Sequence, residues 1–332
     1  NNNLITGFQI GKESDSFDER YIEIRAISVV VATGCIERPL LFENNERPGV
    51  MQTGCALRMA HTYGLLPGEK AVFSIGHDLG LETAVSLYDL GLEISCVADV
   101  RKEGQDRELL AKLRKRDIEL LKGSVATTAH GQKHVTKVTV ATVSGSAPQD
   151  YDCDLLVASA GLTPVTSAIT VARGRLKYDE HTGYFLPHKM PEKMHATGRI
   201  LGLDDGAAIE SSGRLAGLRA AFDCDACSIA EIGDAESDLD CLPGPARGTR
   251  LVIAPVKGRK SFICFDEETT VKNINQAIDK GFDVPELIKR FTSAGTGPGQ
   301  GGIPGHNLPL YVAEYQKLPG ISIRPTTVRP PV

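Results

Sequence analysis

The chain has 332 residues, a formal net charge of -5 at pH 7, 41% hydrophobic and 24% charged residues, which is ordinary for a water-soluble globular protein of two or three domains. An acidic balance without a long basic run argues against nucleic acid or an anionic membrane as partner. No apolar stretch approaches the roughly 20 residues of a bilayer-spanning helix, and no secretory segment opens the chain, so a cytoplasmic protein is expected.

The first informative segment is residues 28–39, SVVVATGCIERP. It reads as a buried, β-branched strand that ends in small residues and turns at Pro39. Such a strand ends in this way where the backbone of a cofactor must pass close to its tip. Thr33 and Gly34 are therefore candidate cofactor contacts.

Residues 4–30 precede this strand and read as strands joined by a polar turn, a β-meander. In two-domain flavoproteins such a meander follows a first glycine-rich βαβ unit. The chain opens on three asparagines rather than Met, so we expect an interior start in a longer polypeptide, without that first unit. We therefore expect the chain alone to bind flavin weakly or not at all.

A nucleotide-type unit is predicted over residues 70–101. The pattern is a short buried strand, a glycine-containing turn, an amphipathic helix and a second strand that ends in an acid. Free N–H groups at the helix start can meet a pyrophosphate, although a full G-x-G-x-x-G fingerprint has one more residue and a middle glycine. The candidate contacts in the turn are Gly76, His77, Asp78 and Gly80.

The end of the second strand carries two further candidates. Asp99 follows the turn by about 20 residues, where an acid can bind a ribose 2'-hydroxyl. Arg101 beside it could equally attract a 2'-phosphate, and both could equally be solvated residues at a strand end. Asp78 has two interpretations as well, since it would either repel a phosphate or cap the helix.

The next candidates follow the return from this unit. The strand LLVASAG ends at Gly161 and the chain breaks at Pro164. Further on, a strand leads to a turn at Asp204-Asp205-Gly206 and a helix of small residues. In two-domain flavoproteins an acid at this turn contacts the nucleotide, so Asp205 and Gly206 are candidates, with helix capping as the alternative for the acids.

The last 80 or so residues are predicted to form a separate helical piece. A helix capped by Thr270 is followed by a second helix from Val284 to Phe291 and a glycine-rich loop. PELIKRFTSAGTGPGQG resembles the small domain of bacterioferritin-associated ferredoxin that carries an iron–sulfur cluster. That resemblance places the cluster ligands at Cys264, Asp266, Gly299 and Pro304. Only one of these is a cysteine, so no iron–sulfur cluster is expected.

The remaining cysteines and the histidines suggest no catalytic site. Cys224-x-x-Cys227, with Cys241 and Cys264, could be proposed as a metal site, but the spacing is irregular. The eight histidines lie apart in the sequence and form no recognisable catalytic or metal-binding group. We predict no catalytic residue and no metal site, so any chemistry must come through a cofactor.

Several blocks together resemble one family. ATGCIERPLLFENNERPGVM, YGLLPGEKAVFS and the closing run from FICFDEETT to TTVRPP are similar to the alpha subunit of heterotetrameric sarcosine oxidase and its relatives, subunits of dye-linked proline dehydrogenase, opine oxidase and hydrogen cyanide synthase. The resemblance implies an α/β, glutathione-reductase-like FAD/NAD(P)-binding two-domain fold, with the first domain incomplete at its N-terminus, plus a small C-terminal helical domain. The expected domains are 1–66 and 151–227 for the first domain, 67–150 for the inserted nucleotide domain, 228–250 for a linker and 251–332 for the helical domain.

The same resemblance implies a function. The implied function is that of an alpha-like subunit, or a fragment of one, in a multi-subunit flavin-dependent enzyme. This enzyme would be an oxidase or dehydrogenase that acts on sarcosine, proline or a similar secondary amine. In that family a beta-type subunit carries FAD and oxidises the amine, the alpha subunit holds NAD or another adenine nucleotide, and a second flavin, FAD or FMN, is possible in the complex. Two alternatives stay open: a self-contained pyridine-nucleotide-dependent flavin oxidoreductase and a non-catalytic nucleotide-binding scaffold.

Overall fold

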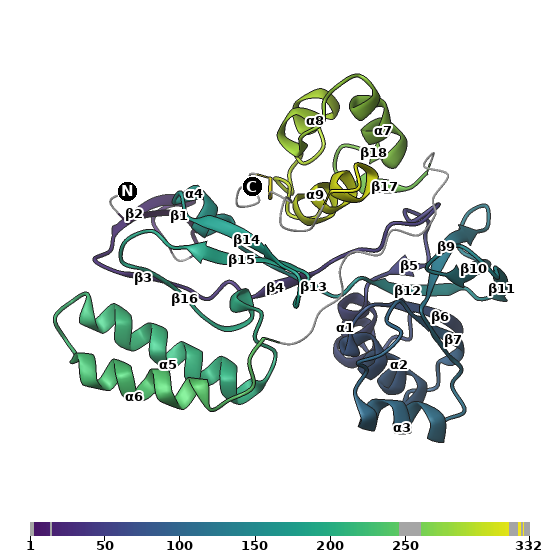
Figure 1. Ribbon diagram of the computed structural model, residues 1–332, viewed down its shortest axis with the longest axis horizontal. Coiled ribbons are helices and arrows are strands. Elements are labelled where there is room, and N and C mark those ends of the chain that lie inside the picture. The colour runs from purple at the N-terminus through teal and green to yellow at the C-terminus, as the bar shows by residue number, and fades with distance from the viewer. Residues whose placement is uncertain (1–2, 14, 246–259, 319–324, 327, 329–332) are drawn as a thin grey trace. The chain divides into compact units, whose positions relative to one another are not determined.

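The computed structural model describes residues 3–13, 15–245, 260–318, 325, 326 and 328 (Figure 1). They fall in two compact units. The smaller comprises Asn1–Gly34, Pro164–Lys177 and Leu186–Ala246; the larger comprises Cys35–Thr163, Tyr178–Phe185 and Arg247–Val332. Within the described ranges, no helix has the length and apolar character needed to cross a membrane.

The larger unit is built on a five-stranded parallel sheet. In spatial order its strands are β5 (Val50–Met51), β12 (Leu155–Ser159), β6 (Lys70–Ile75), β7 (Glu93–Asp99) and β8 (Leu120–Lys122). The helices of this sheet are α1 (Thr53–Tyr63), α2 (Asp78–Asp89) and α3 (Arg107–Lys115). An antiparallel sheet is formed by β9 (Ser124–His130), β10 (Lys137–Thr142) and β11 (Gln149–Asp152). The α/β fold predicted from the sequence is confirmed, and β6, α2 and β7 form the strand, helix and strand predicted over residues 70–101.

Side-chain alternation along β6 explains this layering, because successive strand residues point to opposite faces of a sheet. Phe73 and Ile75 pack with helix residues such as Leu81 in one core cluster. Val72 packs with the antiparallel sheet in the other. Ser74 is fully buried on the second face, where its hydroxyl accepts a hydrogen bond from the Ala126 N–H at 3.0 Å.

The C-terminal part of the larger unit is helical. It contains β17 (Phe262–Cys264), β18 (Thr269–Thr270), α7 (Val271–Asp279), α8 (Pro285–Thr292) and α9 (Pro304–Tyr315). Thr270 and Asn273 form a reciprocal capping box at the start of α7. The predicted helices correspond to α7 and α8, whereas α9 was not predicted.

The smaller unit contains a parallel pair of short strands, β3 (Val29–Val31) and β16 (Met194–Ala196). Its other elements are the hairpin β1 (Leu4–Ile10) and β2 (Glu19–Arg25), α4 (Ser167–Val171), the 3-10 helix η1 (Gly198–Leu201), α5 (Gly206–Phe222) and α6 (Ile229–Asp240). In Figure 1, α5 and α6 run side by side next to β3 and β16. Buried apolar side chains of β3, α4, β16 and η1 form the core of this unit.

Two pairs of strands lie where the division between the units passes. They are β4 (Cys35–Glu37) with β13 (Leu162–Pro164), and β14 (Arg175–Asp179) with β15 (Tyr184–Lys189). Residues 35–66, expected in the first domain, group with the larger unit, since β5 pairs with β12. The domain boundaries given above stay a prediction.

Within the linker predicted over residues 228–250, residues 229–240 form a helix, α6. A capping box between Ser228 and Glu231 starts this helix, and Ala235 is buried. Local capping therefore outweighs a composition rich in Asp and Gly. Residues 246–250 of the predicted linker lie outside the described residues.

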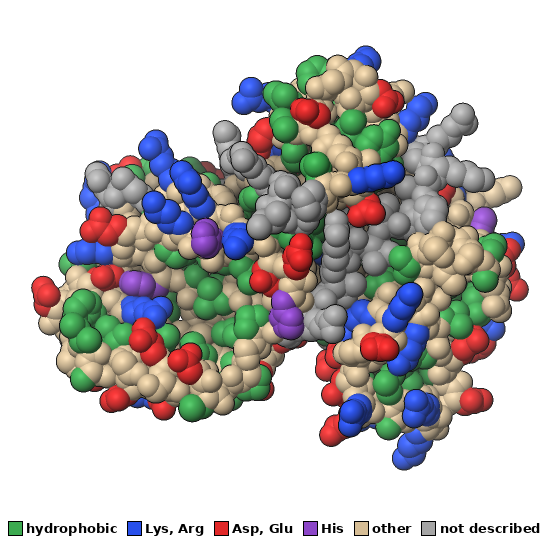
Figure 2. Space-filling view, viewed as in Figure 1, with side chains coloured by type: hydrophobic (Ala, Val, Ile, Leu, Met, Phe, Trp, Pro, Cys, Tyr) green, Lys and Arg blue, Asp and Glu red, His purple; other side chains and the backbone are tan. Residues whose placement is uncertain are grey.

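Charged side chains of both signs are interspersed over the face of the molecule in Figure 2. Basic residues gather in the last turn of α3, at Lys112, Arg114 and Lys115. All three side chains are exposed.

Candidate functional site

The turn between β6 and α2 contains the first group of candidates. His77 is the N-cap of α2, and its Nδ1 accepts a hydrogen bond from the Leu79 N–H at 3.2 Å. The Gly80 N–H donates to the His77 carbonyl at 3.0 Å. His77, and not Asp78, therefore caps this helix, and two of its first N–H groups already have protein partners.

Packing requires a glycine at position 80 and leaves little space at position 76. A Cβ at Gly80 would lie 2.4 Å from Cγ2 of Ile75, so the residue allows α2 to start directly against β6. A Cβ at Gly76 would lie 3.2 Å from Val100 and 3.3 Å from the carbonyl oxygen of Ala160. Gly80 therefore has a role in the fold that does not depend on a ligand, and Gly76 lies in a tightly packed position.

Gly161, the candidate at the end of β12, lies beside this turn. It has a φ of +101°, a conformation that favours glycine. A Cβ there would be 3.5 Å from Cβ of His77. The structure thus brings Gly161 together with the 76–80 turn at the carboxyl ends of β6 and β12.

The other end of the turn faces a buried ionic cluster of Asp78, Arg101 and Asp99. The guanidinium of Arg101 donates to the Asp99 carboxylate from Nε at 3.1 Å and from Nη2 at 2.8 Å, and Nη2 also pairs with Asp78 at 2.7 Å. Asp99 has no exposed surface, and the Arg101 side chain is 10% exposed. Burial alone would lower the pKa of Arg101, but the hydrogen bond that it donates to Asp99 and the charges of both acids raise this pKa above its ordinary value.

This geometry corrects one interpretation of the sequence. Asp99 and Arg101 are not solvated residues at a strand end, because they bind each other below the surface. The cluster of two carboxylates and one guanidinium carries a formal charge of minus one, which disfavours the added charge of a 2'-phosphate. Sequence reasoning found both positions but gave no sign of the pairing with Asp78.

The candidates Thr33, Gly34, Asp205 and Gly206 lie in the smaller unit. Thr33 Oγ1 donates to the Val165 carbonyl at 2.6 Å. Asp205 is the N-cap of α5, and its carboxylate accepts from the Ala208 N–H at 2.9 Å. Asp205 therefore caps α5, as the alternative interpretation of this acid predicted.

The glycines of this second group differ from those of the first. A Cβ at Gly34 or at Gly206 would meet no atom within 4 Å. Gly34 has a φ of +66°, whereas Gly206 is the first residue of α5. Packing therefore does not require a missing side chain at either position, and the space beside each is open.

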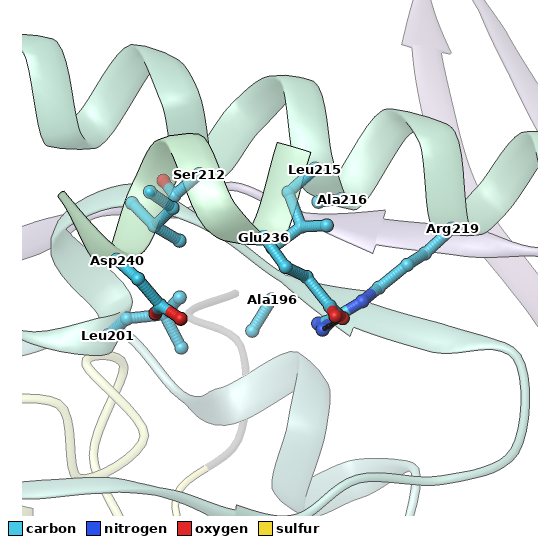
Figure 3. A pocket seen from close by; sticks show the side chains of 9 residues that line it. Ala196, Leu201, Ser212, Leu215, Ala216, Arg219, Glu236 and Asp240 are labelled. Atoms are coloured by element: carbon cyan, nitrogen blue, oxygen red, sulfur yellow. Dashed lines mark hydrogen bonds and ion pairs between the residues drawn. The ribbon is translucent and has the colours of Figure 1, made fainter. Parts of the chain in front are cut away.

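A pocket of about 290 Å³ lies in the same unit, between α5, α6 and the end of β16 (Figure 3). Arg219 and Glu236 meet across it at 2.6 Å, and Leu215 and Ala216 supply apolar lining. The hydroxyl of Ser212 contacts Thr197 Oγ1 at 2.9 Å. Sequence reasoning missed this pocket because one of its walls is the helix that was expected to be a linker.

A second pocket, of about 370 Å³, lies in the larger unit. It opens beside the carboxyl ends of β5 and β12 and is lined mainly by apolar side chains, among them Phe42, Met51, Phe265 and Ile303. Phe265 and Ile303 come from the C-terminal helical part. No sequence pattern marks this pocket, since its lining comes from segments far apart in the chain.

A buried arginine–histidine contact joins the start of the larger unit to α9. Arg38 Nη1 and His306 Nε2 are 2.5 Å apart, and Thr163 Oγ1 lies 3.0 Å from His306 Nδ1. Because a guanidinium can only donate, Nε2 must accept, and the proton of the neutral ring lies on Nδ1. Burial, aided by the Arg38 charge, lowers the pKa of His306 well below its ordinary value, and burial lowers that of Arg38 to about 10.

The positions that the ferredoxin resemblance assigns to cluster ligands are engaged with the protein itself. The Asp266 carboxylate accepts from the Gly299 N–H at 2.9 Å, and the Cys264 thiol lies 3.3 Å from the Gly295 N–H. Across the residues that the structure describes, no group of three or more His, Cys, Asp or Glu side chains could hold a metal ion.

Comparison with known proteins gives two family matches in order along the chain. Residues 5–195 match the pyridine nucleotide-disulphide oxidoreductase family, and residues 258–332 match the sarcosine oxidase A3 domain. These matches and the relatives below confirm the family resemblance and the FAD/NAD(P)-type oxidoreductase fold predicted from the sequence.

The similar curated proteins include the alpha subunit of sarcosine oxidase from Corynebacterium sp. (strain P-1), 30% identical over 297 residues, which cover 85% of this chain and 30% of the relative. The A subunit of opine oxidase from Agrobacterium tumefaciens (strain Ach5) is 25% identical, with 94% and 68% covered. Among solved structures, L-proline dehydrogenase from P. horikoshii has a TM-score of 0.72 at 22% identity, covering 94% of this chain and 58% of that one. The chain thus spans about 30% of the length of the sarcosine oxidase subunits that it matches.

Proposed function

Because this chain belongs to the pyridine nucleotide-disulphide oxidoreductase family, we propose that it serves as an alpha-like subunit, or part of one, in a multi-subunit flavin-dependent amine oxidase or dehydrogenase. The observation that carries the proposal is the order of the two family matches. An oxidoreductase region, 5–195, is followed by a sarcosine oxidase A3 region, 258–332. The names of the relatives, which are single subunits of sarcosine oxidase and of opine oxidase, support a role as one subunit of several.

The proposed substrate is a secondary amine such as sarcosine or proline. We assign its oxidation to an FAD-bearing, beta-type partner subunit. This division of work is supported by the side chains of the present chain: His306 is buried against Arg38, and the Cys96 and Cys153 thiols are buried with pKa values raised to about 12. None of these groups is placed or ionised as a base or nucleophile for an amine would be.

The proposed cofactor of this chain is NAD or another adenine nucleotide, with FAD or FMN in the assembled complex. A nicotinamide or flavin ring would supply hydride or electron transfer, and the chain would bind and orient it. The space beside Gly34 and the space beside Gly206, the first residue of α5, are open and would leave room for a phosphate backbone at a site that includes both glycines. Thr33 and Asp205 would border this site. A second set of residues proposed to bind the nucleotide lies in the larger unit: Gly76, His77, Asp78, Gly80, Asp99, Arg101 and Gly161.

Purification from the native host tests the proposal. An affinity-tagged chain should bring down a second, flavin-bearing protein in a fixed ratio, and the complex should reduce a dye with sarcosine or proline. The untagged strain is the control. A tagged chain that elutes alone and oxidises NADH with added flavin would instead support the self-contained oxidoreductase. A lone chain that binds nucleotide without activity would support the scaffold. The cytoplasmic location stays a prediction.

A further inference from the structure

We propose that Arg101 is an internal plug at the ribose end of the nucleotide unit, where it holds Asp99 in the way that the hydroxyls of a bound adenine nucleotide would. The inference rests on the proposed nucleotide-binding function and concerns the regulation of that same site. It assigns Arg101 the role of a residue that must move before an adenosine ribose can bind.

The first step concerns Asp99. It ends β7 directly opposite Ile75, the last residue of β6, which is where an acid in a strand–turn–helix–strand unit reaches ribose hydroxyls. Its carboxylate accepts the Arg101 backbone N–H at 2.9 Å, two guanidinium hydrogen bonds and the Gln105 amide at 3.3 Å. With these donors in place, no free acceptor and no exposed surface remain for a ligand.

The second step concerns how Arg101 is held. Its inner partner, Asp99, is fully buried, whereas its outer partner, Asp78, lies on the first turn of α2 with a side chain 32% exposed. The side chain of Arg101 therefore spans from the end of β7 to the helix start, across the place where an adenosine ribose would sit. The Asp78 oxygen that pairs with Arg101, Oδ1, is buried although the rest of the Asp78 side chain reaches solvent, so this pair adds to the contacts that hold Arg101 in place.

The third step is the exchange itself. A ribose diol offers two O–H donors, which can replace the guanidinium Nε–H and Nη2–H on Asp99, while the backbone N–H and Gln105 keep their contacts. The number of hydrogen bonds to the buried carboxylate is thus conserved. Arg101 belongs to the segment after β7, so its side chain can move away from Asp99 without any change in the strand. Binding is weakened by the free energy needed to break both ion pairs.

Isothermal titration of the whole chain with NAD tests the plug. Arg101→Ala should bind NAD at least about tenfold more tightly than the wild type, because a charge-assisted bond from ribose to Asp99 becomes available without displacement. Asp78→Asn, which keeps Asp99 paired, should bind more tightly by a smaller factor. Arg101→Ala combined with Asp99→Asn should lose the gain. Arg116→Ala is the matched control, since it removes a similar two-bond contact, with Asp89, elsewhere on the surface.

The direction of the change in NAD affinity distinguishes the possible roles of Arg101. Weaker binding in Arg101→Ala would show that Arg101 is a ligand contact, and unchanged binding would show that the nucleotide lies elsewhere; either overturns the plug. If Arg101→Ala is too unstable to titrate, Asp78→Asn alone decides, and an affinity no higher than that of the wild type overturns the proposal. A failure of every variant and the wild type to bind NAD, NADP or ATP would overturn nucleotide binding as well, whereas amine oxidation by the complex is measured separately.

Discussion

At the scale of single residues, the best-defined group is the pair of Arg38 and His306, which are 268 positions apart. Each is fully buried, and each uses the other as a hydrogen-bond partner. Arg38 Nη2 also donates to the Ala160 carbonyl at 2.8 Å, so Arg38 links the residues that follow β4 and β12 to α9. Because the His306 ring is buried beside the positively charged Arg38, protonation of this ring would destabilise the fold.

We therefore predict that the larger unit loses stability in mild acid. Because the pKa of His306 is lowered in the folded state, the unfolded chain takes up a proton near pH 6.5 that the folded chain does not. The free energy of unfolding should be flat above that pH and fall below it by at most about 1.4 kcal/mol per pH unit from this group. Urea denaturation between pH 7.5 and 5.5 measures the slope.

The variant His306→Gln separates this group from other acid effects. It should lower stability at pH 7.5 by about 1–3 kcal/mol, since a buried donor loses its partner, and should reduce the loss between pH 7.5 and 5.5. His188→Gln, at an exposed position, is the control. A slope that His306→Gln leaves unchanged would contradict the assignment.

A second prediction concerns Gly80. We predict that Gly80→Ala lowers the free energy of unfolding by about 1–3 kcal/mol, because a Cβ there would lie 2.4 Å from Ile75. Gly217→Ala, in the middle of α5 with open space around it, should instead be neutral or stabilising. Thermal denaturation compares the two. Loss of nucleotide binding without loss of stability in Gly80→Ala would mean that the glycine serves the ligand after all.

Residue types at the nucleotide unit could be found from the sequence, but their partners could not. A glycine after a buried strand and an acid at the end of the next are local signals, and they located Gly76, Gly80 and Asp99. The pairing of Arg101 with Asp78 depends on side-chain geometry at a sheet edge. The contact of Arg38 with His306 depends on how α9 packs, and periodicity carries no information on that.

At the scale of elements, α6 shows that an interpretation based on composition can overlook a short local signal for a helix. Its residues are rich in Asp and Glu, which favoured a linker. The helix is held by the Ser228 and Glu231 capping box and by exposed pairs such as Arg219 with Glu236. Because few apolar contacts support it, its stability should depend strongly on the cap.

We predict that Ser228→Ala weakens α6 by about 1 kcal/mol, as the loss of a cap side chain typically does. Hydrogen exchange of the amides in 229–240 should accelerate about fivefold, while exchange in β6 stays unchanged. Ser237→Ala, inside the same helix, is the control, because Ser237 only bonds back to the Gly233 carbonyl. Equal protection in both variants would show that packing, and not the cap, determines the stability of α6.

The helix α9 was missed for a different reason. It begins at Pro304 and contains Pro309, and a proline inside a helix removes one backbone hydrogen bond. The sequence therefore favoured a loop. Tertiary packing outweighs this, since every residue from Pro304 to Ala313 is buried. By contrast, α7 and α8 were predictable, because a capping threonine and an N-terminal proline mark their starts.

A further prediction at this scale is that the C-terminal helical part, purified within the whole chain under anaerobic conditions, holds no iron–sulfur cluster. Its one cysteine at the expected ligand positions, Cys264, is buried against the backbone of Gly295, and Asp266 binds the Gly299 N–H. Iron analysis and the visible spectrum provide the measurement. About two irons per chain, with a matching absorbance, would contradict it.

At the scale of the whole molecule, the sequence predicted the α/β class, the nucleotide unit and the order of the family blocks. Each of these rests on local patterns or on resemblance along the chain. The grouping of residues 35–66 with the larger unit was not predictable, because it follows from the pairing of β5 with β12, which are about a hundred residues apart. The same limit applies to the two pockets, whose walls come from distant segments.

The central claim is that this chain works as one subunit of an amine oxidoreductase, and steady-state dye reduction by the complex tests it most directly. The complex isolated through the tagged chain should reduce a dye with sarcosine or proline as the electron donor, and the separated chain should not. A different secondary amine as the best donor would alter only the substrate. A complex that is inactive with every secondary amine but oxidises NADH, or full NADH-dependent activity in the separated chain, would contradict the account.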